Sequence, residues 1–225
     1  MSLLSLQNVS KNYLSDGQRV EALKGLSLEA NRGTFIALVG RSGCGKSTLL
    51  NLAGAMDFPT SGQVLVEGIS TSSLNDAALT RLRRDKVGFV FQSFQLLHTL
   101  TVFENVELPL LLAGKPHARE AAQERLESVE LKGLGDRYPH QLSGGQMQRV
   151  AIARALIHSP CLILADEPTG NLDTTTGNVI LELLRRLTRE QNTATILATH
   201  SLEAATLADR VVRMRDGQIE EILER

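Results

Sequence analysis

The chain has 225 residues, of which 42% are hydrophobic and 22% are charged, and its formal net charge is -1 at pH 7. This length fits one large domain, or one domain with a small inserted lobe, that buries a sizeable core. A net charge so close to zero gives no electrostatic reason to expect a nucleic-acid partner. The two cysteines, Cys44 and Cys161, are too few for a disulfide framework or a metal cluster, and we expect both to be free thiols.

The sequence carries no recognisable targeting or membrane-spanning segment. Residues 1–7 lack the basic region of a signal peptide and reach polar side chains early. No apolar run approaches the roughly 18 to 20 residues that are needed to span a bilayer. We therefore expect a cytoplasmic protein that does not itself form a pore.

The first thirty residues are typical of an antiparallel β flap, because two alternating runs, Leu4–Val9 and Leu26–Ala30, flank a turn at Ser15-Asp16-Gly17. Beyond this flap, short apolar runs alternate with helical patterns, which predicts an α/β fold with a mainly parallel core sheet. The expected strands are Phe35–Val39, Val64–Val66, Val87–Phe91, Leu162–Ala165, Thr195–Ala198 and Val211–Met214. The expected helices of the core are Lys46–Ala55, Gln146–His158 and Thr176–Arg189.

Residues 93–141 contain helix formers in place of strand-like runs, which indicates a helical lobe inserted into the core. Helices are expected at Thr101–Ala113 and Pro116–Glu130. Pro109 should kink or end the first of them, because proline lacks the N–H that continues a helix. We therefore expect a single domain over residues 1–225, with the core and flap at 1–92 and 142–225.

A phosphate-binding loop follows the expected strand at 35–39. Gly40, Gly45, Lys46 and Ser47 satisfy the pattern G-x-x-x-x-G-K-[ST] between an apolar strand and an amphipathic run. Glycines let backbone N–H groups approach phosphate oxygens, and the positive end of the following helix adds to the attraction. Lys46 should reach the β- and γ-phosphates of ATP, and Ser47 should offer its hydroxyl to Mg²⁺. The nucleotide-binding residues predicted here are Gly40, Arg41, Ser42, Gly43, Cys44, Gly45, Lys46, Ser47 and Thr48.

Paired acids follow the expected strand at 162–165. Asp166 ends the strand, where its carboxylate would point toward the Mg²⁺ ion of the phosphate loop. Glu167 comes next and would face the attacking water. The alternative is a strand that ends in two solvated acids with no catalytic role.

Ser143, Gly144 and Gly145 precede the expected helix at 146–158, so Ser143 should cap its N-terminus. The exposed N–H groups and the helix dipole there form a second anion site. One nucleotide would then have two phosphate-binding surfaces on one chain. A two-fold homodimer explains this, with each ATP between the phosphate loop of one subunit and the Ser143 segment of the other. The alternative is an ordinary serine cap beside a flexible glycine pair.

The order of three motifs, Gly40–Thr48, Leu142–Gln146 and Cys161–Glu167, resembles the ATP-binding subunit of an ABC transporter over nearly the whole chain. The resemblance implies that Glu167 is the catalytic base. It also implies that Ser143, Gly144, Gly145 and Gln146 form the signature that contacts the γ-phosphate in trans.

The same resemblance assigns roles to four separate residues. Tyr13 stacks on adenine, although a lone tyrosine in a strand is more often a packing residue. Gln92 senses Mg²⁺ and water, and Asp173 belongs to the stretch that crosses to the second subunit. His200 contacts the γ-phosphate and holds the water of Glu167. The catalytic set is thus Glu167, His200, Gln92 and Lys46, and the Mg²⁺ set is Ser47, Gln92 and Asp166.

Two further stretches, Glu104–Gly114 and Pro168–Asp173, look like the lipoprotein-release and macrolide-exporter branch of this family. That branch implies an ATP-hydrolysing motor on the inner face of the cell membrane, bound to a separate integral membrane permease subunit. Apolar residues of Leu108–Leu112, with Phe94, Leu96 and Leu97, could receive a helix of that subunit, although core packing is the alternative for each leucine. A regulatory ABC ATPase that acts on cell-wall remodelling partners has the same motifs. A DNA-repair ATPase would need a coiled-coil insert, and a small-molecule kinase has no use for the signature.

Overall fold

A computed structural model describes residues 2–15 and 17–225, so Asp16 of the expected turn lies outside the described residues. The expected flap is present. Strands β1 (Leu4–Ser15) and β2 (Gln18–Ala30) pair antiparallel along their whole length. β4 (Ser61–Val66) and β5 (Ile69–Ser70) extend the sheet in the order β2-β1-β4-β5. The run at 64–66 therefore belongs to the flap and not to the core sheet.

The second sheet is mainly parallel, which confirms the predicted fold class. Its order is β10-β9-β3-β8-β7-β6, and only β10 runs antiparallel to its neighbour. Five of its strands were expected from their apolar runs, and the structure extends three of these by one or two residues. The strands are β3 (Phe35–Val39), β6 (Val87–Phe91), β7 (Leu162–Asp166), β8 (Ala194–Thr199), β9 (Arg210–Arg215) and β10 (Gln218–Glu224).

Seven α-helices surround the sheets in the part of the chain that the structure describes, and none of them is long and apolar enough to cross a membrane. They are α1 (Lys46–Ala53), α2 (Asp76–Lys86), α3 (Val102–Leu112), α4 (Ala118–Ser128), α5 (Gly144–Leu156), α6 (Thr174–Glu190) and α7 (Leu202–Leu207). Two short 3-10 turns, Thr71–Ser73 and Pro139–Gln141, complete the described elements. The sequence analysis did not predict α2, a mainly polar helix that buries only Leu79 and Leu82.

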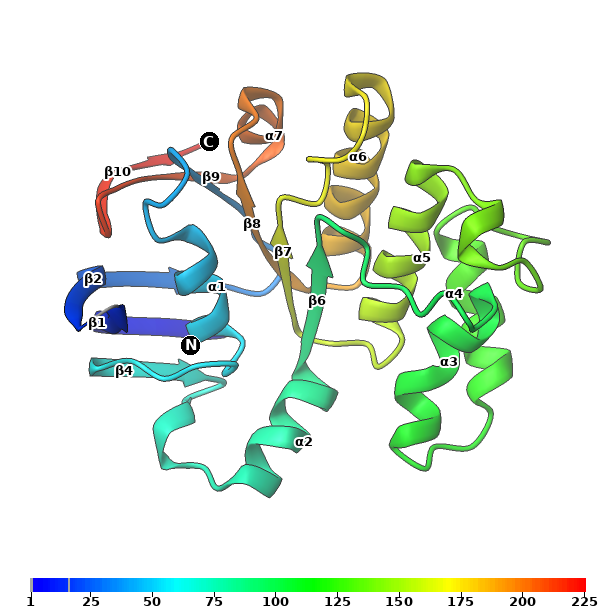
Figure 1. The fold of residues 1–225 in the computed structure, drawn as a ribbon, viewed down its shortest axis with the longest axis horizontal. Coiled ribbons are helices and arrows are strands. Elements are labelled where there is room, and N and C mark those ends of the chain that lie inside the picture. The colour runs from blue at the N-terminus through cyan, green and yellow to red at the C-terminus, as the bar shows by residue number, and fades with distance from the viewer. Residues whose placement is uncertain (1, 16) are drawn as a thin grey trace.

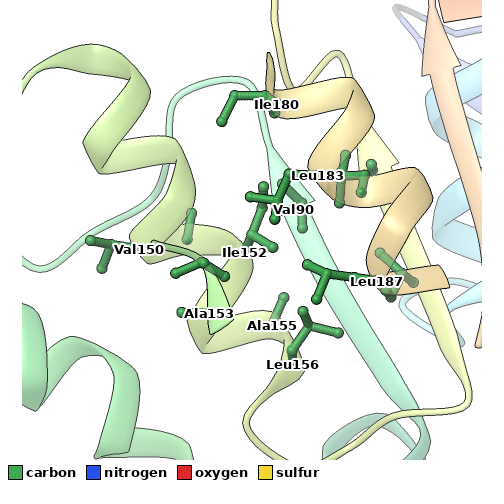
Figure 2. Close-up of a cluster of buried hydrophobic side chains, with 14 of the residues drawn as sticks. Val90, Val150, Ile152, Ala153, Ala155, Leu156, Ile180, Leu183 and Leu187 are labelled. Carbon is green, nitrogen blue, oxygen red and sulfur yellow. The ribbon is translucent and has the colours of Figure 1, made fainter. Parts of the chain in front are cut away.

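Alternate residues of the core strands face two different hydrophobic clusters. In β3, Phe35 and Ala37 join the cluster that includes α5 and α6, whereas Ile36 and Leu38 join the cluster that includes α1 and the flap. Figure 1 shows the flap and α1 on one side of the strands and α5 on the other. Figure 2 shows Val90 of β6 between the labelled side chains of α5 and those of α6. Each fully buried leucine or isoleucine stabilises this core by about 1.5–3 kcal/mol.

The helices α3 and α4 pack against α5 within the same cluster, through residues such as Val106, Ala122 and Val150. Helix α3 continues through Pro109 to Leu112, so the proline does not end the helix, and the kink that was the other expected outcome stays a prediction. The proline removes only one donor near the end of the helix, and the last turn is closed by the Ala113 N–H, which lies 3.1 Å from the Pro109 carbonyl oxygen. The boundaries 93–141 of the inserted lobe stay a prediction, because α5 packs against both parts.

Gly54 at the end of α1 provides a test of this packing. A Cβ added there would overlap the Phe89 ring of β6 and lie 2.9 Å from Leu164 Cδ1. Gly54→Ala should therefore lower the free energy of unfolding by about 1–3 kcal/mol, because the core is already filled. Urea denaturation without nucleotide measures the change.

Gly177 within α6 is the matched control, because an added Cβ there makes an ordinary 3.4 Å contact with Thr169. Gly177→Ala should raise stability by about 0.5–1 kcal/mol, since alanine favours the helix. Equal effects of the two substitutions would contradict the packing described here.

Candidate functional site

The register of the parallel sheet brings four chain segments to one edge. Leu38, Ala198, Asp166 and Phe91 form one continuous row across β3, β8, β7 and β6. Each of these strands ends at or just after this row, so the segments that follow them emerge side by side at the carboxyl edge of the sheet. This edge is where α/β proteins bind ligands. The predicted residues of the phosphate loop, Asp166, Glu167, Gln92 and His200 all lie there.

The phosphate loop needs glycine at its last turn. Gly45 has φ 103° and directly precedes α1, and a Cβ at this position would collide with the Ala22 carbonyl of β2. A side chain would therefore be both strained and obstructed. Lys46 begins the helix and is only 6% exposed. Its Nζ donates hydrogen bonds to the carbonyl oxygens of Gly40 at 2.8 Å and Arg41 at 3.1 Å.

The two cysteines are free and buried, as the sequence predicted. Cys44 Sγ lies 3.9 Å from Lys46 Nζ at the carboxyl edge of the sheet. Cys161 directly precedes β7 at the opposite edge. A disulfide between them would need Cα atoms less than about 7 Å apart, which this placement excludes.

Asp166 and Ser47 form a pair of oxygen groups between β7 and α1. Burial raises the pKa of the Asp166 carboxyl, whereas the hydrogen bond with Ser47 lowers it and the neighbouring Glu167 raises it. Hydroxyl and carboxylate oxygens are the donors that Mg²⁺ prefers, so these two residues fit such an ion. Among the described residues, no group of three or more His, Cys, Asp or Glu side chains could hold a metal. An ion here would therefore take its other ligands from water and phosphate oxygens.

Glu167 adopts an unusual backbone conformation for a residue other than glycine, with φ 46°. Two hydrogen bonds hold this turn: the Glu167 N–H donates to Ala198 O at 2.9 Å, and the Gly170 N–H donates to Glu167 O at 3.0 Å. The carboxylate Oε2 lies 3.2 Å from His200 Nδ1. Both side chains line a cavity of about 170 Å³. A drug-sized ligand needs about 300–1,000 Å³, and no residue of 40–48 lines this cavity, so it forms only part of a nucleotide site.

Gln92 is paired with Asn171, a residue that the sequence analysis did not single out. The Gln92 amide donates to Asn171 Oδ1 at 3.1 Å, and the Asn171 amide donates to the Gln92 carbonyl at 3.1 Å. A side chain at Gly170 would collide with Gln92. The stretch Pro168–Asp173 had been noted as a family pattern, and its asparagine could have been assigned this contact only with the fold in hand.

Ser143 caps α5, as predicted. Its Oγ accepts from the Gln146 N–H at 3.3 Å, and the Gln146 side chain accepts from the Ser143 N–H at 3.0 Å. Gly145 packs against the first turn of α6, where an added Cβ would collide with Thr176. Thr176 also donates hydrogen bonds to Asp173, which lowers the pKa of that carboxyl.

The signature and the Glu167–His200 pair line different cavities. Ser143, Gly145 and Gln146 line a depression of about 360 Å³ with Glu130 and Arg149, and this lining shares no residue with the cavity beside Glu167. The first turn of α6 contributes to both, with Asp173 on one side and Thr176 on the other. A single chain therefore does not bring its signature into its own hydrolytic cavity.

Tyr13 lies on β1 beside the phosphate-loop helix, with 38% of the side chain exposed. Its hydroxyl donates to Asp57 Oδ2 at 2.8 Å and also interacts with the Thr48 side chain in the first turn of α1. This placement allows a nucleotide base to reach the ring.

Two arginines of α5 connect it to neighbouring segments. Arg149 donates to the Val129 carbonyl at 3.1 Å. Arg154 donates to the carbonyls of Phe94 at 2.9 Å and Gln95 at 2.5 Å. The segment that follows Gln92 is thereby fixed to the signature helix.

The predicted docking residues fall into two groups. Leu96 and Leu110 are buried, so core packing explains them, whereas Leu97, Leu111 and Leu112 are exposed. Phe94 and Leu108 are half-buried and belong to neither group.

Comparisons with known proteins agree with this geometry. Residues 23–170 match the family described as ABC transporter. The lipoprotein-releasing system ATP-binding protein LolD of Myxococcus xanthus is 45% identical over 98% of this chain and 100% of its own length. The macrolide export ATP-binding/permease protein MacB of Rhodopirellula baltica is 46% identical over 97% of this chain, which spans 33% of that longer protein.

Solved structures give the same result. The dimeric structure of MJ0796, an ABC transporter cassette of Methanocaldococcus jannaschii, superposes with a TM-score of 0.90 at 43% identity and covers 98% of both chains. A second dimeric structure of MJ0796, bound to ADP and Pi, represents a post-hydrolysis state and gives the same score. The chain therefore belongs to the ABC transporter family and is an ABC-type ATPase similar to LolD and to the ATP-binding part of MacB.

Proposed function

We propose that this chain is the motor subunit of a membrane ABC transporter, in which two copies bind two ATP molecules head to tail. The observation that carries the proposal is the separation of Ser143 and Gly145 from Glu167 and His200 on one chain. Two-fold pairing would place the signature of one subunit over the phosphate loop of the other. The dimeric structures of MJ0796 support this arrangement.

Lys46 binds the β- and γ-phosphates in this proposal. Its ammonium would exchange two neutral carbonyl partners for charged phosphate oxygens, which form stronger hydrogen bonds. The backbone N–H groups of residues 40–48 surround the phosphates. Ser47 and Asp166 would hold Mg²⁺ on the side of β7, with Gln92 nearby at the end of β6. A bound Mg²⁺ ion supplies charge that stabilises the developing negative charge of phosphoryl transfer.

Glu167 is the proposed general base, and His200 its partner. The left-handed turn of Glu167 costs of order 1–3 kcal/mol, and such strain persists where the surroundings hold a residue in place for function. The turn puts the carboxylate beside His200, which would hold it and the attacking water. Asp173 borders the same cavity, so it lies where the second subunit would approach.

The membrane partner is proposed from the similarity to LolD and MacB. Those proteins are described as parts of a lipoprotein-releasing system and a macrolide exporter, and this chain would drive a similar process of export or lipoprotein release. It would act on the inner face of the cell membrane through a separate permease subunit. The exposed leucines of α3 form a surface for a helix of that subunit. A regulatory ATPase that activates cell-wall remodelling partners is the second candidate, because it needs the same ATP site.

Glu167→Gln tests the hydrolytic role and the dimer together. The variant should bind ATP but hydrolyse it about a hundredfold more slowly or worse, because the general base is lost. It should accumulate as an ATP-bound dimer, which light scattering after size-exclusion chromatography in Mg-ATP measures. Glu182→Gln, an exposed carboxylate on α6, should retain wild-type turnover. A monomeric Glu167→Gln protein at saturating Mg-ATP would overturn the two-subunit site.

Ser143→Arg tests the trans contact. The arginine should block the γ-phosphate of the opposing site, so dimerisation and hydrolysis should be lost while the ATP affinity of the monomer is retained. Asn75→Arg is the matched control, since Asn75 caps α2 in the same manner. Both changes should cost about 0.5–2 kcal/mol of stability, but only Ser143→Arg should remove ATPase activity. Normal hydrolysis by Ser143→Arg would refute the trans contact.

Purification of Glu167→Gln from its native membranes in mild detergent and Mg-ATP tests the transport assignment. Mass spectrometry should identify a partner with few membrane spans and a large extracytoplasmic domain. Leu112→Asp on α3 should reduce its recovery at least tenfold, whereas Ile69→Asp, a similarly exposed apolar residue on β5, should not. Recovery of a division-site protein bound to a cell-wall hydrolase would favour the regulatory candidate.

A further inference from the structure

Lys11, Tyr13 and Asp57 form a connected cluster beside the phosphate-loop helix. Lys11 and Tyr13 are two residues apart on β1, so their side chains share one face of the strand. Asp57 follows α1 and accepts from both: Lys11 Nζ lies 2.6 Å from Oδ1, and the Tyr13 hydroxyl lies 2.8 Å from Oδ2. No sequence pattern indicates this cluster, because Asp57 lies 44 residues beyond Tyr13 in the chain.

The Asp57 carboxylate is itself fixed. Its Oδ1 accepts from the Phe58 N–H at 2.7 Å, and Lys11 Nζ also donates to the Phe58 carbonyl at 2.8 Å. Burial disfavours the charged carboxylate, but hydrogen bonds from Lys11, Phe58 and Tyr13 outweigh it and lower the pKa of Asp57. The group is therefore ionised at neutral pH, and a charged acceptor forms a stronger bond with the phenol than a neutral one would.

The ammonium of Lys11 lies over one face of the Tyr13 ring, 4.9 Å from the ring centroid. This cation–π contact adds to the hydrogen bond in fixing the plane of the ring. It also occupies that face. A planar ligand can therefore stack only on the opposite face of Tyr13.

The cluster also sets the position of the ring relative to the phosphate loop. The phenol interacts with Thr48 in the first turn of α1 and bonds to Asp57 beyond the end of the same helix. The chain between them folds back, because the Met56 N–H donates to Asn51 O at 2.8 Å. These contacts near both ends of α1 thereby fix the distance between the Tyr13 ring and the loop that would bind the triphosphate.

We propose that Asp57 and Lys11 are positioning residues that hold Tyr13 as a one-faced platform for the nucleotide base. This inference rests on the proposed function and on the stacking of the base on Tyr13 that the family resemblance implies. Every base has a π face, so such a platform raises the affinity for nucleoside triphosphates in general without selecting strongly among them. It leaves the affinity for the triphosphate group itself unchanged.

Three variants of the full chain separate the anchor from the ring: Asp57→Asn, Tyr13→Phe and Tyr13→Ala. Loss of one base–aromatic stack in Tyr13→Ala should raise KM for ATP about tenfold or more. Asp57→Asn and Tyr13→Phe keep the ring but remove its anchor, and each should raise KM about two- to tenfold with kcat unchanged. The Asp57→Asn/Tyr13→Phe double variant should be no worse than either alone, because both remove the same bond.

Inorganic tripolyphosphate, which lacks a base, is the control ligand. Its inhibition constant should equal the wild-type value in the three single variants and in the double variant. Glu67→Gln is the matched control variant, because Glu67 pairs with Lys86 at 2.8 Å and its side chain is 30% exposed, as is that of Asp57. This variant should leave KM unchanged.

A direct readout of the anchor is the ionisation of the phenol, since the chain has two tyrosines and no tryptophan. Tyr138→Phe leaves Tyr13 as the single chromophore that titrates. Burial, followed by the contact with Asp57, raises the pKa of Tyr13. Asp57→Asn should move this pKa downward in an absorbance titration at 295 nm, and Glu67→Gln should not.

The outcomes are distinct. If Tyr13→Ala raises KM but Asp57→Asn and Tyr13→Phe do not, the positioning role of Asp57 is wrong. The stacking of the base on Tyr13 then stands. If Tyr13→Ala itself leaves KM unchanged, the stacking on which the inference rests is wrong. If Asp57→Asn weakens the binding of tripolyphosphate as much as that of ATP, Asp57 has a general structural role and the inference is overturned.

Discussion

The row of hydrogen-bonded residues across β3, β8, β7 and β6 is the constraint on which the site depends. A shift of one residue in any of these pairings would displace one of the groups at the carboxyl edge. It would also turn the side chains of the shifted strand toward the opposite hydrophobic cluster. The alternating burial of Phe35–Leu38 between two clusters prevents such a shift. The same apolar contacts that stabilise the fold therefore hold the phosphate loop, Glu167 and Gln92 in register.

The separation of the two phosphate-binding surfaces follows from the close packing of α5 against α6. Gly145 and Thr176 are so close that a methyl group would not fit between them, and Asp173 anchors the turn from the other side. The first turn of α6 is thus a rigid partition between the signature and the hydrolytic cavity. Because the two surfaces line separate cavities within one chain, the geometry supports the proposed dimerisation on ATP.

The sequence was sufficient for the parts of the fold that have strong local signals. Apolar runs located β3 and β6 to the residue, and the glycine and lysine spacing located the phosphate loop. The flap strand β4 was not separated from the core strands, because a three-residue apolar run is similar in both environments. Contacts between distant segments, such as Gln92 with Asn171 and Tyr13 with Asp57, leave no periodic trace. Polar residues of this kind acquire their roles only when the fold brings them together.

Helix α5 connects the two halves of the proposed cycle. In the proposed dimer its N-terminus would present Ser143 to the ATP of the opposing subunit, and its last turn holds, through Arg154, the carbonyls of Phe94 and Gln95. These two residues both adopt left-handed conformations, with φ 60° and 53°, so the segment after Gln92 is strained and depends on that contact. A helix transmits a displacement along its length with little deformation. Movement of Ser143 toward a γ-phosphate in trans would therefore also move the Gln92 segment. This segment leads to Leu97, which is held by Asn105 in the first turn of α3, the helix whose exposed leucines are proposed to contact the membrane partner.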